Sequence, residues 1–109
     1  MQVVFLEGSR PGVVWFLGYY SKRPELDFNA AKAALRIAID TIGQHPFSVQ
    51  KLERFDAVFE KKVIRTAFSV LYTIREDTIF VIDIHDQRGF RSAEALSTYS
   101  LELRSKYGM

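Results

Sequence analysis

Basic side chains and a histidine gather in the second half of the chain, and their types suit proton transfer beside a bound anion. Lys61, Lys62 and Arg65 precede an alternating run of residues, while His85 and Arg88 follow the next apolar run. A histidine exchanges protons near neutral pH, and cations hold a phosphate as its charge builds. Adjacent antiparallel strands bring such residues onto one sheet surface. The sequence therefore predicts one basic cluster, with His85 as the group that transfers a proton.

Ordinary structural roles explain the same residues, and these alternatives stay open. Lysines on an outer strand are commonly solvated and discourage pairing with other sheets. His85 suits a structural hydrogen bond at the end of a strand. Arg88 and Arg91 flank a glycine in a predicted turn, where they contact either a ligand or only water.

Asp83 is the one carboxylate inside an otherwise apolar run, residues 79–84. A buried carboxylate without a partner is costly, so it needs a cation or backbone donors. We expect Arg65 or Arg75 to pair with it, in a structural rather than a catalytic role.

Composition excludes several other kinds of site. The chain of 109 residues has no cysteine, which excludes disulfides, thiolate metal ligands and thiol nucleophiles. Its two histidines are far apart, and it has neither a glycine-rich phosphate loop nor a nucleophile elbow, so we expect no metal and no cofactor. Fifteen basic against thirteen acidic residues leave a net charge of +2, which allows a nucleic-acid partner without requiring one. No apolar run is long enough to span a membrane, and we expect a soluble, cytoplasmic protein.

A strand and a helical hairpin are predicted for the first half of the chain. Residues 3–6 are strand formers, and Ser9 followed by Pro11 is typical of a helix start, here over residues 11–22. An apolar stripe predicts a second helix from residue 27 or 29 to residue 43. The short connection makes the two helices antiparallel neighbours. Three aromatic residues of the first helix are expected in the hairpin core rather than as a platform for bases: Trp15, Tyr19 and Tyr20.

Strands dominate the second half. Alternation predicts strands over residues 55–65 and 68–75, a tight turn at Glu76-Asp77, and a central strand over residues 78–85. Ser92 is expected to cap a last helix that ends at Gly108. The fold class is therefore α+β, with an N-terminal strand, a two-helix hairpin, a three-stranded antiparallel meander and a C-terminal helix in one domain, residues 1–109. We expect the hairpin to cover one face of the sheet and the other face to meet partners.

The second half also carries a pattern of residue types found in a known family. The pattern is a basic strand, an aromatic residue, a tyrosine, an acidic turn and an apolar strand followed by a histidine and an arginine: Lys61-Lys62, Phe68, Tyr72, Glu76-Asp77, His85 and Arg88. The helical hairpin before it ends in His45-Pro46. In these features the chain resembles the RelE/ParE superfamily of bacterial toxins, over nearly its whole length.

This resemblance implies a function and partners. Members are the toxin half of type II toxin–antitoxin systems of the plasmid stabilisation type; they inhibit growth and are neutralised by a cognate antitoxin. RelE-like members cut messenger RNA on the ribosome without a metal, whereas ParE-like members poison DNA gyrase. A member that is not toxic and only binds another protein is a third alternative. The resemblance leaves open whether the chain forms a homodimer or a toxin–antitoxin hetero-oligomer.

If the chain is a ribonuclease, the resemblance implies two sets of residues. Arg65, His85 and Arg88 are the catalytic candidates, while Lys61, Lys62 and Arg91 are the candidates for substrate binding. Ser69 occupies the position of an arginine in the family's ribonucleases. That serine and the low net charge favour the gyrase type over RNA cleavage.

Overall fold

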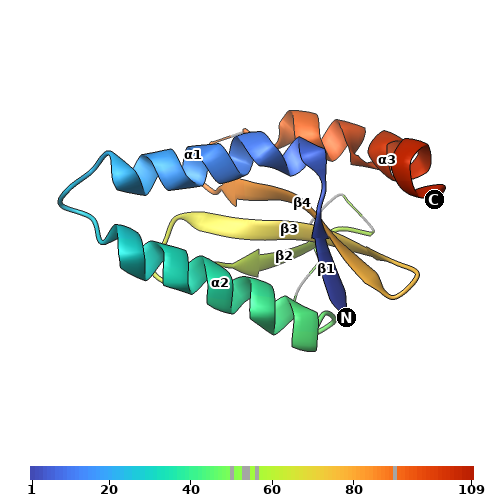
Figure 1. Cartoon of the computed structure of the whole chain (residues 1–109), viewed down its shortest axis with the longest axis horizontal. Coiled ribbons are helices and arrows are strands. Elements are labelled where there is room, and N and C mark those ends of the chain that lie inside the picture. Colours follow the sequence, from blue (N-terminus) through green and yellow to red (C-terminus); the bar gives the residue numbers. More distant parts are fainter. Residues whose placement is uncertain (50, 53–54, 56, 90) are drawn as a thin grey trace.

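A computed structural model describes residues 1–49, 51–52, 55, 57–89 and 91–109 of the chain. The elements follow one another along the chain as a strand, a short 3-10 helix, two α-helices, three strands and a last α-helix (Figure 1): β1 (Gln2–Phe5), η1 (Glu7–Ser9), α1 (Arg10–Ser21), α2 (Phe28–Gln44), β2 (Phe59–Lys62), β3 (Phe68–Arg75), β4 (Thr78–Asp86) and α3 (Ala93–Tyr107). The predicted α+β class and the predicted hairpin and meander are confirmed.

The four strands form one mixed sheet in the order β1-β4-β3-β2. β2, β3 and β4 are antiparallel neighbours, as the meander requires, whereas β1 pairs in parallel with the first half of β4, from Thr78 to Val81. In the described part of the chain, no strand pairs with the rest of β4 on that side, and α1 begins next to it. The turn between β3 and β4 has positive φ at both Glu76 and Asp77, which matches the twist of a two-residue hairpin.

Buried side chains alternate between the two faces of the sheet. One face packs beneath α1 and α2 and carries Phe68, Val70, Tyr72, Ile79, Val81 and Ile84. The opposite face packs against α3 and the segment after β1 and carries Leu71, Phe80 and Ile82. In Figure 1, α3 lies next to the start of α1. The expectation that the second face meets partners is thus wrong for these residues, because α3 and Leu6 bury them.

The predicted helices are confirmed, but two of the predicted caps are wrong. Asp27 caps α2, because its Oδ1 accepts a hydrogen bond from the backbone N–H of Ala30 at 2.9 Å. Ser9 and Ser92 also precede helices, yet neither side chain caps its helix. Ser9 Oγ instead donates to the carbonyl of Leu6, and Ser92 Oγ donates to the carboxylate of Asp83.

The first strand of the meander is shorter than predicted. The alternation suggested residues 55–65, whereas β2 spans Phe59–Lys62. Asp56, within the predicted strand, lies outside the described residues. Arg65 follows the strand in a turn and has a φ of 59°, which no strand residue adopts. Backbone extension therefore ends before Arg65 and places it at the end of the β2–β3 hairpin.

Candidate functional site

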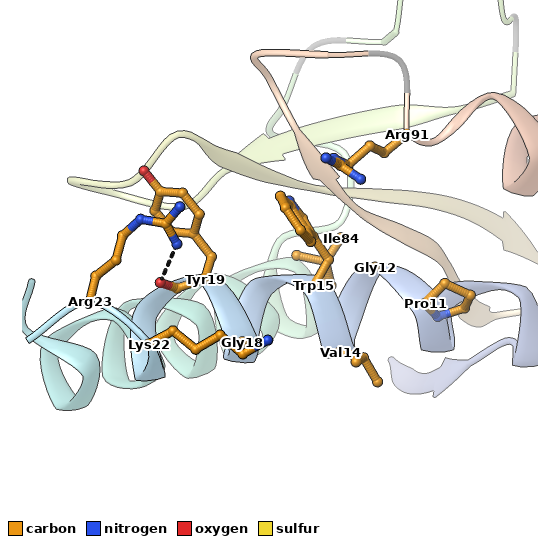
Figure 2. A pocket seen from close by; sticks show the side chains of 10 residues that line it. All are labelled: Pro11, Gly12, Val14, Trp15, Gly18, Tyr19, Lys22, Arg23, Ile84 and Arg91. Carbon is orange, nitrogen blue, oxygen red and sulfur yellow. Dashed lines mark hydrogen bonds between the residues drawn. The ribbon is translucent and has the colours of Figure 1, made fainter.

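A groove with a volume of about 600 Å³ runs along α1, and five of its ten lining residues are aromatic or basic (Figure 2). We call it the α1 groove and define it by Trp15, Tyr19, Lys22, Arg23 and Arg91. Trp15, Tyr19 and Arg23 follow one another at intervals of four residues, so they lie on one side of the helix and of the turn that ends it. Arg91 reaches the groove from the segment before α3. Helical spacing and the approach of one neighbouring segment are therefore enough to assemble the site.

Trp15 is held between an arginine and an aspartate. The guanidinium carbon of Arg91 lies 3.6 Å from the centre of the Trp15 ring, within the range of a cation–π interaction. The indole Nε1 donates a hydrogen bond of 2.8 Å to Oδ2 of Asp86, at the end of β4. The two contacts fix the orientation of the indole and leave part of its surface in the groove.

Two guanidinium groups contact Tyr19. Those of Arg23 and Arg88 lie 3.9 and 4.2 Å from the centre of the Tyr19 ring. Arg23 Nη1 also donates to the backbone carbonyl of Tyr19 at 2.9 Å, and Arg88 Nη1 donates to the Tyr19 hydroxyl. Tyr19 therefore holds two cations next to the groove.

Arg88 forms a forked ion pair with Asp86. Its Nε and Nη2 donate to the two carboxylate oxygens of Asp86 at 2.8 and 2.9 Å. The Arg88 guanidinium holds the pKa of the buried Asp86 carboxyl well below its usual range, and the Asp86 carboxylate in turn raises the pKa of Arg88. Such a forked pair uses the geometry by which arginine otherwise binds a phosphate. Arg88 therefore connects Asp86 at the end of β4 with Tyr19 of α1.

A second polar chain connects β4 with the start of α3. Ser92 Oγ donates to Oδ2 of Asp83 at 2.6 Å and lies 2.8 Å from Nδ1 of His85. Asp83 Oδ1 accepts from the backbone N–H of Ile84. Burial raises the pKa of Asp83 to about 6, and the hydrogen bonds from Ser92 and Ile84 oppose that rise. The expected backbone donor to Asp83 is confirmed in Ile84, whereas the expected pairing with Arg65 or Arg75 is wrong, because the side-chain partner is Ser92.

The order of this chain excludes a serine nucleophile. In a catalytic triad the histidine stands between the serine and the carboxylate. Here Ser92 stands in the middle, and only 1% of its surface is exposed. Ser92 is therefore a bridge between Asp83 and His85.

Gly12 allows α1 to approach this part of β4. A Cβ atom at residue 12 would lie 1.9 Å from Asp83 Oδ1 and 2.8 Å from the carbonyl oxygen of Ile84. Only glycine fits at these distances. The α1 groove and the Asp83–Ser92–His85 chain therefore both adjoin the close contact between Gly12 of α1 and β4.

The lysines and Arg65 lie elsewhere on the molecule. Lys62 pairs with Ser69, and Ser69 pairs with His85, so the three residues form one row across β2, β3 and β4. Lys61 is the preceding residue of β2 and is half-buried. Arg65 lines a separate cavity of about 220 Å³ between the β2–β3 turn and α2. The six residues predicted from the sequence are thus divided among the α1 groove (Arg91), its rim (Arg88), the sheet row that Ser69 joins (Lys62 and His85), the opposite face of β2 (Lys61) and the hairpin end (Arg65).

Ser69 is sealed inside the protein. Its exposed surface is 0%, and Gln87 Nε2 donates to its hydroxyl at 2.7 Å. Ser69, which the resemblance aligns with an arginine of the toxin family's ribonucleases, therefore offers no side chain to a substrate.

Sequence reasoning missed most of the α1 groove. Lys22 and Arg23 were not among the predicted site residues, and Trp15 and Tyr19 were assigned to the core. Tyr20 is buried as expected, whereas Trp15 and Tyr19 are only half-buried. The signal that could have separated them is the four-residue spacing of Trp15, Tyr19 and Arg23, which excludes Tyr20.

Comparison with known proteins assigns no function to this site. No protein-family model matches the chain, and no curated protein matches it. Within the described part of the chain, no group of three metal-ligating side chains is placed to hold a metal, and no helix is long and apolar enough to cross a membrane. An assignment of function therefore depends on the geometry of the α1 groove and on the resemblance of residues 61–88 to a toxin family.

Proposed function

We propose that the chain is the toxin of a type II toxin–antitoxin pair, that it inhibits growth by binding a protein target, DNA gyrase, and that a cognate antitoxin neutralises it. The toxin class comes from the resemblance in residues 61–88. The observation that carries the binding mode is the composition of the α1 groove, where a tryptophan and a tyrosine lie against arginines. Tryptophan, tyrosine and arginine are the residues that contribute most to protein–protein interfaces.

The placement of the cations supports binding over RNA cleavage. Metal-free cleavage needs cations that converge on one phosphate together with groups that move protons. Arg88 is instead engaged by Asp86, and Arg65 lines a different cavity from Arg91. Ser69 adds no charge to the surface.

One observation favours a second candidate, a ribosome-dependent endoribonuclease. His85 ends a hydrogen-bonded chain and lies in the same row as the exposed Lys62, so a proton acceptor and a cation share one stretch of sheet. In that candidate His85 moves the proton and Lys62 contacts the substrate backbone, whereas Lys61 lies on the opposite face of the sheet. Arg65, Arg88 and Arg91 would then have to change position.

Expression in a bacterial host with and without the neighbouring open reading frame distinguishes these functions. We expect growth arrest, accumulation of double-strand breaks and an SOS response, all relieved when the neighbouring protein is co-expressed. Cuts at codon boundaries in primer extension on bulk messenger RNA, without DNA breaks, would instead establish the endoribonuclease. Unimpaired growth together with tight binding to the neighbouring protein would leave only a protein-binding role.

A charge reversal in the groove locates the activity. Arg23→Glu places a carboxylate in the α1 groove, and we expect it to relieve growth arrest. Arg36→Glu makes the same change on the exposed side of α2 and is the matched control. Equal toxicity of the two variants would mean that the α1 groove is not the binding surface.

A further inference from the structure

Asp83, Ser92 and His85 form a continuous hydrogen-bonded chain that reaches from the interior to the end of β4. Asp83 is 3% exposed and Ser92 is 1% exposed, whereas His85 is half-buried. The two links measure 2.6 Å from Ser92 Oγ to Asp83 Oδ2 and 2.8 Å from Ser92 Oγ to His85 Nδ1. Both lengths are typical of good hydrogen bonds. These hydrogen bonds therefore link the protonation state of the buried Asp83 carboxylate to the ring of His85, which is partly exposed.

The number of protons that the three side chains carry determines which atom donates in each hydrogen bond. An ionised carboxylate can only accept hydrogen bonds, and a serine hydroxyl has one proton to donate. Because that proton is used toward Asp83, the oxygen of Ser92 must accept the bond from His85. The proton of neutral His85 is therefore on Nδ1, and Nε2 carries a lone pair.

We propose that Asp83 and Ser92 are positioning residues that hold His85 as the Nδ1–H tautomer, so that Nε2 accepts a hydrogen bond or a proton from a ligand bound at the end of β4. The ligand must present a donor, such as a hydroxyl or an N–H group. Lys62, in the same sheet row, is available to an anionic part of that ligand. This inference does not depend on the proposed function, because it concerns the state of the ring itself.

The surroundings of Asp83 contain groups that favour its ionised form and groups that oppose it. Asp83 lines a cavity of about 150 Å³ together with one cation and two carboxylates from other segments: Arg91, Glu94 and Glu7. The backbone N–H of Ile84 donates directly to Asp83. Since burial raises the pKa of Asp83 to about 6, the carboxylate is charged at neutral pH and above. A protonated Asp83 donates to Ser92 and reverses the whole chain.

Nitrogen NMR of the intact protein tests the proposal directly. Long-range proton–nitrogen correlation spectra distinguish a protonated from an unprotonated ring nitrogen, and the measurement is made at about pH 8, where imidazoles are neutral. We expect His85 to show a protonated Nδ1 and an unprotonated Nε2. His45 is the second of the two histidines, and it is exposed at the end of α2, so it provides an internal reference. A protonated Nε2 or an even mixture at His85 in the wild-type protein would overturn the proposal.

Three variants test which residues set the tautomer. In Asp83→Asn the amide oxygen remains with the N–H of Ile84 and the amide nitrogen faces Ser92, so Ser92 donates to His85 and the tautomer becomes Nε2–H. In Ser92→Ala the chain is cut, and the preference for Nδ1–H falls about tenfold, as expected when one hydrogen bond in a charged chain is lost. Ser92→Thr keeps the hydroxyl and restores the wild-type tautomer. If His85 remains Nδ1–H in both Asp83→Asn and Ser92→Ala, Asp83 and Ser92 are not positioning residues; the wild-type spectrum remains decisive should a variant not fold.

Discussion

At the scale of single residues, Asp83 makes the stability of the protein depend on pH. Burial raises the pKa of Asp83 from its ordinary value near 4 to about 6 in the folded state. Between these values the folded protein binds more protons than the unfolded chain, so the free energy of unfolding decreases as the pH rises from 4 to 6 and is then constant. A pKa difference of this size between the folded and unfolded states corresponds to about 3 kcal/mol. Asp83→Asn should lack this decrease, as measured by urea unfolding across the pH range, and an identical decrease in the variant would assign it to another group.

Asp86 differs from Asp83 although the two carboxylates are three residues apart. Asp86 is paired with Arg88, which lowers its pKa, so its contribution to stability is present above the ordinary pKa of a carboxyl and is lost at lower pH, as Asp86 is protonated. Among the residues that the structure describes, no cation is bonded to Asp83, and burial dominates its pKa. The two carboxylates therefore change the free energy of unfolding in opposite directions as the pH rises, and of the two Asp83 titrates nearer to physiological pH.

Trp15 reports directly on the α1 groove, because it is the chain's only tryptophan. Arg91 covers its ring at 3.6 Å. Arg91→Ala should therefore expose the indole and increase the quenching of its fluorescence by acrylamide, with a change in stability of no more than about 1 kcal/mol for an exposed cation–π contact. Arg104→Ala, on the exposed side of α3, should leave the quenching unchanged. Equal quenching in wild type and Arg91→Ala would mean that the contact is absent in solution.

At the scale of elements, the contact between α1 and β4 depends on Gly12. A Cβ in Gly12→Ala meets the carboxylate of Asp83 and the carbonyl of Ile84, so α1 must move away from the strand. We expect a loss of about 2 kcal/mol, within the range found for overpacked sites. Gly18→Ala in the same helix is the matched control, because its nearest neighbour would be Lys22 Nζ at 3.9 Å. The control should gain up to about 1 kcal/mol from helix propensity. Thermal unfolding of the two variants measures this difference, and equal unfolding midpoints would contradict the close contact between α1 and β4.

Local patterns predicted which elements form but not how their polar side chains are used. The apolar stripe of α2 and the alternation in β3 depend on spacing within one segment, and both helix and strand were predicted correctly. The partners of Ser9 and Ser92 depend on the fold, because a serine before a helix bonds to whichever acceptor the tertiary structure brings near. For the same reason the Asp83–Ser92–His85 chain, which crosses between two elements, could not be predicted from spacing.

The α1 groove likewise depends on contacts between elements, which spacing within one segment does not predict. The sequence places Arg88 and Arg91 two and five residues beyond the end of β4, but it does not show that they turn back toward Tyr19 and Trp15. Aromatic residues on an apolar helix are usually buried. Only the position of the turn after β4 relative to α1 reveals that two of them instead hold cations.

At the scale of the whole molecule, the balance of charges indicates weak binding to nucleic acids. The chain carries a net charge of +2, and its exposed cations are spread over several surfaces, including the α1 groove, the sheet row, the β2–β3 hairpin, α2 (Arg36) and α3 (Arg104). Affinity for a nucleic acid grows with the number of phosphates neutralised at one surface, and the same number sets its salt dependence. We therefore expect a labelled single-stranded RNA to bind with a dissociation constant no tighter than about 10⁻⁴ M at physiological salt, in the weak range for non-specific complexes.

Fluorescence anisotropy at several salt concentrations measures both quantities. A gyrase-directed inhibitor should show this weak binding and a shallow salt slope, and Lys62→Glu should change it little, because one phosphate contact contributes a slope of only about one. Arg36→Glu, on α2, controls for the change in net charge. Micromolar binding with a steep salt slope that Lys62→Glu reduces and Arg36→Glu does not would identify the sheet row as an RNA surface. The ribonuclease candidate, with His85 as its proton acceptor, would then replace the proposed function.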